Sequence, residues 1–396
     1  MAYGDASTGN TLTNLIPTLY LALDTVSREL VGFIPAVTRD SQLARAAIGQ
    51  TVRSFVAPAA TASDLVARAV PPDDGEQTIG NISLGITKSR RVPIRWQGEE
   101  SMQMNSLGGP GVSQILVDQF AQAMRTLTNE IEADLGGLYK YASRGVVPHA
   151  TTLFSDGLDD AANVRKILVD NGAPTSDLQL VIDTSAGAAL RSLTQLSKAN
   201  EAGGTDLLRQ GVLLDIHGFK IRESAQVVTP DSVGTEDSAT LDTADYSKGA
   251  TALTLAAAGT GTVLAGDLVT IANTGDTTTQ YVNTTLIPAV SGGALTIAAP
   301  GLLKAITANN CAIAVRAAGS RCLAFARSAI VLATRMPALP EGGDLAVDRT
   351  TITDPRSGLS FEVSKYMQYR QVQYEVSIAW GVKAVKTEHI AILAGA

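Results

Sequence analysis

Apolar residues recur at steps of four and three along one stretch of the chain, from Gly111 to about Arg144. The residues that follow this spacing are Val112, Leu116, Phe120, Met124, Leu127, Ile131, Leu135 and Leu138. Such spacing lays one apolar stripe along an α-helix, so we predict a helix of roughly 45 Å that packs against a core. A coiled coil is the alternative, although the stripe is wider than an a/d seam and the e/g charges do not alternate in sign. We interpret the helix as a spine to which other elements attach.

Three carboxylates, Glu130, Glu132 and Asp134, lie in the C-terminal half of this predicted helix. The helix dipole disfavours negative charge near that end. Either the three side chains form a solvated face, or cations from elsewhere in the chain or from another subunit meet them.

A flap is predicted between Thr51 and Glu100, where two extended segments flank a Pro-Pro-Asp-Asp-Gly turn cluster. Its acidic tip consists of Asp73, Asp74 and Glu76, and its second segment carries Lys88, Arg90, Arg91 and Arg95. A long two-stranded hairpin with few apolar residues is not stable alone in water. We therefore expect the flap to dock on another surface through its opposite charge blocks; a solvated hairpin with ordinary charges is the alternative.

The remaining segments differ in pattern. Residues 11–34 form an amphipathic stripe that predicts a helical arm, and Gly157–Val228 reads as a compact α/β unit. From Pro230 to about Thr307, short alternating strands separated by Gly, Asp and Asn predict a small β-barrel or sandwich. This part is an insertion, because the α/β pattern resumes at Cys311. Long alternating runs after residue 358 predict antiparallel strands, and the fold class is therefore α+β.

Composition narrows the functional classes. The formal net charge is −7 and no long basic run is present, which argues against a protein that grips nucleic acid through phosphates. Cys311 and Cys322 fit neither a metal spacing nor a disulfide framework, so we expect reduced thiols. The N-terminal residues lack the pattern of a signal peptide, and no apolar run approaches the ~18 residues of a membrane span. We expect a soluble protein that is made and kept inside a cell.

Motifs for catalysis are missing. The sequence holds no nucleophile elbow, P-loop, dinucleotide glycine pattern or HExxH. The three histidines, His149, His217 and His389, are far apart, and His217 followed by Gly218 is typical of a hairpin turn. We predict no catalytic, cofactor-binding or metal-ligating residues.

The order of these parts, together with local sequence, resembles a known family. The stretches that carry the resemblance are NLIPTLYLALDTVSRELVGFIPAV, IGNISLGITKSRRVPIRWQGEE, DQFAQAMRTLTNEIEADL, DNGAPTSDLQLVIDTSAGAALRSL, QGVLLDIHGFKIRES and IAWGVKAVKTEHIAILAG. They are similar to the coat proteins of Salmonella-type podophages, the P-twenty-two-like family. This is a group of tailed-bacteriophage major capsid proteins with the Hong Kong ninety-seven fold. The resemblance covers nearly the whole chain and is weak in the insertion.

The resemblance also implies a division of the chain. The implied parts are an N-terminal arm (1–50), an extended loop that reaches over a neighbouring subunit (51–100), the spine helix of a peripheral domain (101–153), two parts of an axial domain that lines pentamer and hexamer centres (154–228 and 311–341), an inserted β domain (229–310) and peripheral-domain strands (342–396).

From this division follow the expected function and partners. The chain would self-assemble as pentamers and hexamers into an icosahedral procapsid and a mature head that encloses double-stranded DNA without sequence-specific binding. A separate scaffolding protein, a portal protein and decoration proteins are the expected partners, and the chain needs no cofactor and no membrane. Assembly would take place in the cytoplasm of the host bacterium, with the product in the virion. We expect Arg90, Arg91 and Arg95 to meet carboxylates of an adjacent subunit.

Two other classes remain open at this stage. A surface-layer or adhesin-like structural protein would also carry a Thr/Gly/Ala-rich β segment, and detection outside unlysed cells would favour it. A cytoplasmic hydrolase that uses His217 and Asp215 is the third alternative, and loss of a turnover in His217→Ala would favour it.

Overall fold

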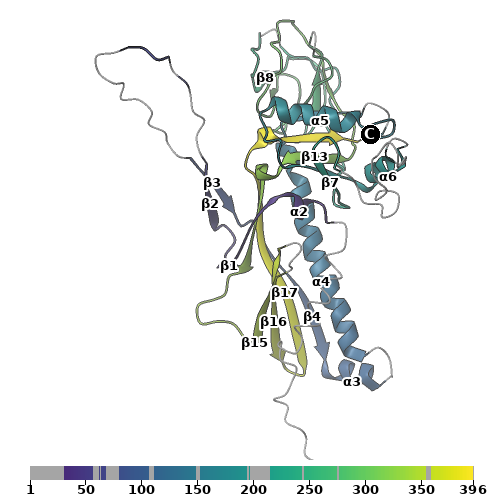
Figure 1. Ribbon diagram of the computed structural model, residues 1–396, viewed down its shortest axis with the longest axis vertical. Coiled ribbons are helices and arrows are strands. Elements are labelled where there is room, and N and C mark those ends of the chain that lie inside the picture. The colour runs from purple at the N-terminus through teal and green to yellow at the C-terminus, as the bar shows by residue number, and fades with distance from the viewer. Residues whose placement is uncertain are drawn as a thin grey trace, which may run out of the picture.

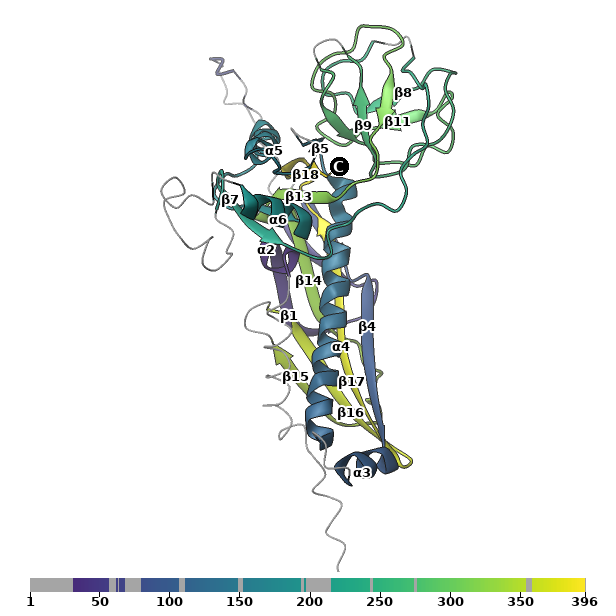
Figure 2. The same cartoon turned by 90° about the vertical axis from the view of Figure 1, so that its right-hand side faces the viewer.

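The computed structural model describes residues 31–56, 62, 64–67, 80–106, 111–148, 152–193, 196, 215–242, 245–273, 276–353 and 358–395. One long helix runs along an elongated body, with a β-sheet beside it and a second sheet at one end (Figures 1 and 2). The chain is α+β, as its sequence pattern predicts.

The central helix is α4, Gly111–Gly136, and a short 3-10 turn, η2 (Gly137–Tyr141), follows it. The predicted stripe is buried from Leu116 to Leu138, as expected for a helix that packs on a core along one face. The helix ends earlier than the predicted limit near Arg144, because the chain turns into strand β5 (Arg144–Val146), which joins a sheet.

A six-stranded sheet packs along α4; we call this sheet and helix the peripheral unit. Its strands are β1 (Thr38–Ala46), β4 (Lys88–Gln97), β14 (Ile330–Pro337), β15 (Ala346–Thr353), β16 (Ser360–Gln368) and β17 (Gln371–Ala384), in the order β1-β14-β17-β16-β15 with β4 also on β17. Alternate residues of β17 face the helix, and Phe120 of α4 meets Tyr374 edge to face at 5.6 Å between ring centres. The short helix α2 (Phe33–Ala36) is buried in the same core.

An eight-stranded sheet forms the other end. Its order is β12 (Ile313–Val315), β9 (Leu268–Ile271), β10 (Gln280–Val282), β5, β18 (Ile390–Ala394), β13 (Arg321–Ala326), β6 (Leu178–Ile182) and β7 (Phe219–Glu223). Helices α5 (Asp159–Asp170) and α6 (Thr184–Ser192) belong to this end. The predicted helix–strand–helix order of the α/β unit is confirmed, with Asp183 capping α6 by accepting a hydrogen bond from the Ala186 amide at 3.0 Å.

Residues 239–313 surround a hydrophobic cluster of their own. Besides β9, β10 and β12 they include the pair β8 (Ala252–Thr254) and β11 (Ala294–Thr296), and several isolated bridges, so the predicted short strands are present. Strand β12 lies in the segment 311–341 that we assigned to the axial domain, yet it pairs with β9. Because β10 pairs with β5, residues 239–313 extend the eight-stranded sheet and are not joined to it by a linker alone.

The flap is shorter in the structure than the predicted range 51–100. Strands β2 (Thr51–Val56) and β3 (Gly80–Gly85) pair antiparallel, but β4 leaves the hairpin and joins β17, and α3 (Gly98–Ser106) follows it. The chain switches partner at Thr87, whose amide donates to the Trp380 carbonyl at 3.0 Å. Ala46, Leu84, Ile86, Ala333 and Ala379 form a small apolar cluster at the root of the hairpin. The hairpin therefore docks at its base on the sheet face that points away from α4.

Close backbone contact at the flap root depends on a missing side chain. A Cβ at Gly381 of β17 would lie 2.1 Å from the Gly85 carbonyl oxygen, which is backbone and not the end of a flexible side chain. We predict that Gly381→Ala destabilises the protein by about 1–3 kcal/mol, as overpacking does in a tight core. Denaturant unfolding measures this. The matched control is Gly137→Ala, since a Cβ there meets nothing within 4 Å; equal stability of the two variants would contradict the prediction.

Candidate functional site

Strand alternation divides the four predicted cations of β4 between two faces of the sheet. Lys88 pairs in register with Trp380 and Arg90 with Ile378, whose side chains lie in the core beneath α4. Lys88 and Arg90 thus point toward the spine helix, and Arg91 and Arg95 toward the open face.

On the helix side, the predicted cations and two of the predicted carboxylates contact each other. Lys88 Nζ lies 2.7 Å from Asp134 Oδ1, and Arg90 Nε lies 3.0 Å from Glu130 Oε2. Asp134 also accepts a hydrogen bond from Trp380 Nε1 at 2.8 Å. The hydrogen bond that Arg90 donates to Glu130 raises the pKa of Arg90. These pairs lie within one chain, whereas the sequence led us to expect contacts between subunits; the latter stay a prediction.

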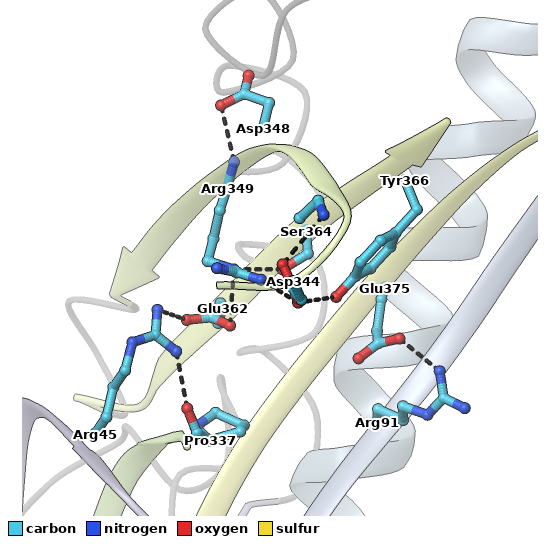
Figure 3. Close-up of polar contacts among 11 residues, drawn as sticks. Arg45, Arg91, Pro337, Asp344, Asp348, Arg349, Glu362, Ser364, Tyr366 and Glu375 are labelled. Carbon is cyan, nitrogen blue, oxygen red and sulfur yellow. Dashed lines mark hydrogen bonds and ion pairs between the residues drawn. The ribbon is translucent and has the colours of Figure 1, made fainter. Parts of the chain in front are cut away.

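On the open face, Arg91 Nη1 lies 2.6 Å from Glu375 Oε2, and this hydrogen bond raises the pKa of Arg91 (Figure 3). Arg95 is exposed and forms no ion pair with the described part of the chain. Of the four predicted cations, Arg95 is thus the one whose charge the described residues leave uncompensated. The acidic tip, Asp73, Asp74 and Glu76, lies outside the described residues.

Beside the Arg91–Glu375 pair, a second set of polar contacts lies on the open face (Figure 3). Arg45 of β1 reaches Glu362 of β16 at 2.5 Å, and Arg349 Nε lies 3.2 Å from the other oxygen of that carboxylate. Arg349 also binds Asp344 at 2.6 Å, and the Tyr366 hydroxyl donates to the same carboxylate at 2.9 Å. The network fixes the edge strand β15 and the end of β1 to the middle of the sheet.

The protonation of Asp344 reflects these contacts. Burial acts to raise its pKa, but hydrogen bonds from the Ala346 amide, Arg349 and Tyr366 outweigh it, so the pKa lies below the ordinary value. Sequence analysis did not find this network; the available signal was the alternation of Glu362, Ser364 and Tyr366 with the apolar residues of β16.

Glu132 differs from the other two predicted carboxylates, and our prediction for it was wrong. It is 1% exposed, so it neither forms part of a solvated face nor meets a cation of another subunit. Its carboxylate accepts hydrogen bonds from the amides of Gly32, Phe33 and Ile34 at 3.2, 3.0 and 2.6 Å, and from Ser224 Oγ at 2.8 Å. Helical periodicity explains the error, because Glu132 follows directly on the buried Ile131 and lies at the border of the apolar stripe.

The burial of Glu132 has a pH consequence. Desolvation raises the pKa of Glu132 above its ordinary value of 4.5, against the opposing effect of the four hydrogen bonds. A group whose folded-state pKa is raised stabilises the fold most below the unfolded-state pKa, and this contribution is lost as pH rises through the folded-state pKa. We predict that the unfolding free energy of the wild type, relative to Glu132→Gln, falls as pH rises above 4.5. Urea titrations over a pH series measure the difference, and a pH-independent difference would contradict the prediction.

Of the three histidines, the structure describes His217 and His389. His217 and Gly218 have φ of 51° and 78° in the tight turn between Ile216 and Phe219, which confirms the predicted turn. His389 is buried after the end of β17, and His149 lies outside the described residues. Within the described ranges, no group of three or more His, Cys, Asp or Glu side chains is placed to hold a metal ion. No helix among them is both long and apolar enough to cross a membrane.

Comparisons with known proteins give structural similarity without sequence relatives. No protein-family model matches the chain, and no curated protein matches it. Among solved structures, the chain is similar to the capsid of the cyanophage P-SCSP1u, with a TM-score of 0.47, 10% identity and coverage of 91% of this chain and 86% of that one. It is also similar to a chain of Mycobacterium phage Che8, with a TM-score of 0.44, 11% identity and coverage of 88% and 85%. A virus-like particle from Pyrococcus furiosus matches with a TM-score of 0.40, 10% identity and coverage of 95% and 96%.

Proposed function

We propose that this chain is the major capsid protein of a tailed double-stranded DNA bacteriophage, with a structural and not an enzymatic role. The observation that carries the proposal is the geometry of the hairpin β2–β3. Its root is fixed by an apolar cluster on the sheet, and within the described part of the chain the two strands pair only with each other (Figure 1). Leu65 and Val66, between these strands, are 104% and 61% exposed. A projecting hairpin with exposed apolar side chains is suited to a surface on a neighbouring chain.

The rest of the chain suits a building block for a shell. A shell wall needs a stiff body and many specific contacts, each modest in energy and repeated over many copies. The spine helix on its sheet supplies the stiff body, and the ion pairs of β4 and the open-face network brace it within one chain. The charged open face is the surface that we assign to the neighbouring flap.

The whole-chain sequence resemblance supports a narrower assignment to the Salmonella-type podophage coat proteins. In this proposal, helix α4 with strands β15, β16 and β17 corresponds to the peripheral domain, and strands β6, β7 and β13 with helices α5 and α6 correspond to the axial domain at pentamer and hexamer centres. Residues 229–310 correspond to an inserted β-barrel domain. Residues 1–50 are the arm, and the hairpin β2–β3 is the extended loop. A separate scaffolding protein and a portal protein are the proposed partners in assembly, decoration proteins are a further class of partner that a binding test has to decide, and DNA is enclosed without sequence-specific binding.

Electron microscopy of the expressed protein tests the proposal. We expect uniform closed shells when the chain is produced with its scaffolding partner, and irregular shells or unassembled subunits when it is produced alone. Dispersed particles of one chain's mass under both conditions would contradict the capsid function.

A further inference from the structure

Three segments that are far apart in the sequence meet at Glu132. They are residues 31–37 with helix α2, the C-terminal part of α4, and residues 223–228 after strand β7. Two of them bond to the same buried carboxylate, which belongs to the third. The Ser224 hydroxyl that donates to Glu132 also accepts a hydrogen bond from the Gln226 amide at 3.2 Å.

The packing around this carboxylate is close enough to require glycine at two positions. A Cβ at Gly32 would lie 2.6 Å from the Glu223 carbonyl oxygen, and a Cβ at Gly136 would lie 2.8 Å from the Gln226 carbonyl oxygen. Phe33 and Ile34, whose amides bond to Glu132, are 0% exposed. The three segments are therefore in direct backbone contact as well as joined through one side chain.

Among the described residues, no cation accounts for the position of Glu132. Its partners are three backbone amides and one hydroxyl, so each bond depends on the exact path of the backbone it holds. A buried amide that loses its only acceptor carries the full desolvation penalty. Because the three amides share one carboxylate, the loss of that carboxylate affects all of them at once, and we expect residues 32–34 to stay bound or to detach as a unit.

We propose that Glu132 is a latch that fixes residues 31–37 to the spine helix and couples their position to that of residues 223–228. Residues 1–30 continue directly from the latched segment, and residues 223–228 lead out of the eight-stranded sheet. The latch thus links the predicted N-terminal arm, the spine and the axial end in one joint. The role of this arm in shell assembly rests on the proposed function; the latch itself does not.

Hydrogen–deuterium exchange of the full-length subunit, read by mass spectrometry, tests the latch without requiring assembly. In Glu132→Ala, we expect peptides that cover 31–37 and 223–228 to exchange about 100-fold faster than in the wild type, because the bonded donors lose their common acceptor. Glu130→Ala is the matched control: it removes a carboxylate two residues away that bonds to Arg90 of β4, and both peptides should keep their wild-type rates. Unchanged exchange in Glu132→Ala would overturn the latch, and acceleration confined to 31–37 would overturn the coupling.

If Glu132→Ala does not fold, the milder variant Ser224→Ala tests the latch. Ser224→Ala deletes one of the four hydrogen bonds to Glu132 and leaves the carboxylate in place, so we expect about tenfold faster exchange of both peptides. It also removes the acceptor of the Gln226 amide, so the diagnostic readout is the peptide that covers 31–37. Wild-type exchange of the peptide that covers 31–37 in a folded Ser224→Ala protein would overturn the proposal. Shell formation is not part of this readout, so a failure here is distinct from a failure of the capsid function.

Discussion

Reversing Arg90, Arg91 and Arg95 to glutamate is expected to prevent closed shells while leaving a folded subunit. If each cation meets a carboxylate of the neighbouring subunit at about 1 kcal/mol, the loss of three contacts weakens association by about 100-fold per subunit. Electron microscopy and sedimentation of the triple variant, produced with the scaffolding partner, measure this. Circular dichroism checks the fold of the subunit. Normal shells from the triple variant would contradict the expected contacts.

Two further variants separate contacts between subunits from contacts within one. The double variant Arg90→Glu, Glu130→Arg exchanges the charges of this pair but keeps the ion pair within the chain. It should therefore restore the assembly that Arg90→Glu loses only if Arg90 acts solely within its own subunit. Arg95→Glu alone disturbs no ion pair of the described residues, and we expect it to impair assembly with unchanged unfolding free energy. Rescue by the charge exchange together with normal assembly of Arg95→Glu would assign these cations to the single chain.

Trp380→Ala is expected to cost about 3–5 kcal/mol of unfolding free energy, the range for removing a large buried aromatic side chain. Trp380 is 0% exposed, packs in the core between β17 and α4, and donates from Nε1 to Asp134 at 2.8 Å. Chemical denaturation measures the loss. Trp380→Phe keeps most of the apolar volume but lacks the indole N–H, and we expect it to cost about 1–2 kcal/mol.

Tyr369→Ala is the control for this prediction. Tyr369 lies in the turn between β16 and β17 and is 89% exposed, so its removal should change the unfolding free energy by no more than about 0.5 kcal/mol. A Trp380→Ala variant as stable as Tyr369→Ala would contradict the burial described for this core.

The elements that the sequence revealed are those whose signal is local. The spine was predictable because its apolar spacing is an intrinsic property of a helix that packs along one face, and the turn at His217 because two adjacent residues specify it. The residue range of the flap was not predictable in this way. Residues 88–97 alternate as a hairpin strand would, and only the long-range pairing with β17 assigns β4 to the sheet.

The same distinction applies to the candidate site. Lys88 and Arg90 were recognised as cations that need partners, and Glu130 and Asp134 as carboxylates that need cations, but nothing local in the sequence matches one set to the other. Glu132 was misjudged because a carboxylate in a helix is usually exposed, whereas here the backbone of residues 32–34, about a hundred positions earlier, supplies the donors. Contacts of this kind depend on how the fold brings distant segments together, and no short stretch of the sequence reveals that arrangement.

Strand β18 has a consequence for synthesis. It lies between β5 and β13 in the middle of the eight-stranded sheet, although β5 precedes it by most of the chain. While residues 390–394 are still inside the ribosome, the facing edges of β5 and β13 have no partner and offer open backbone to any other nascent chain. This sheet therefore cannot close until residues 390–394 have left the ribosome. We expect newly made chains to depend on a chaperone that shields those edges, and to aggregate at the temperature where that supply runs short.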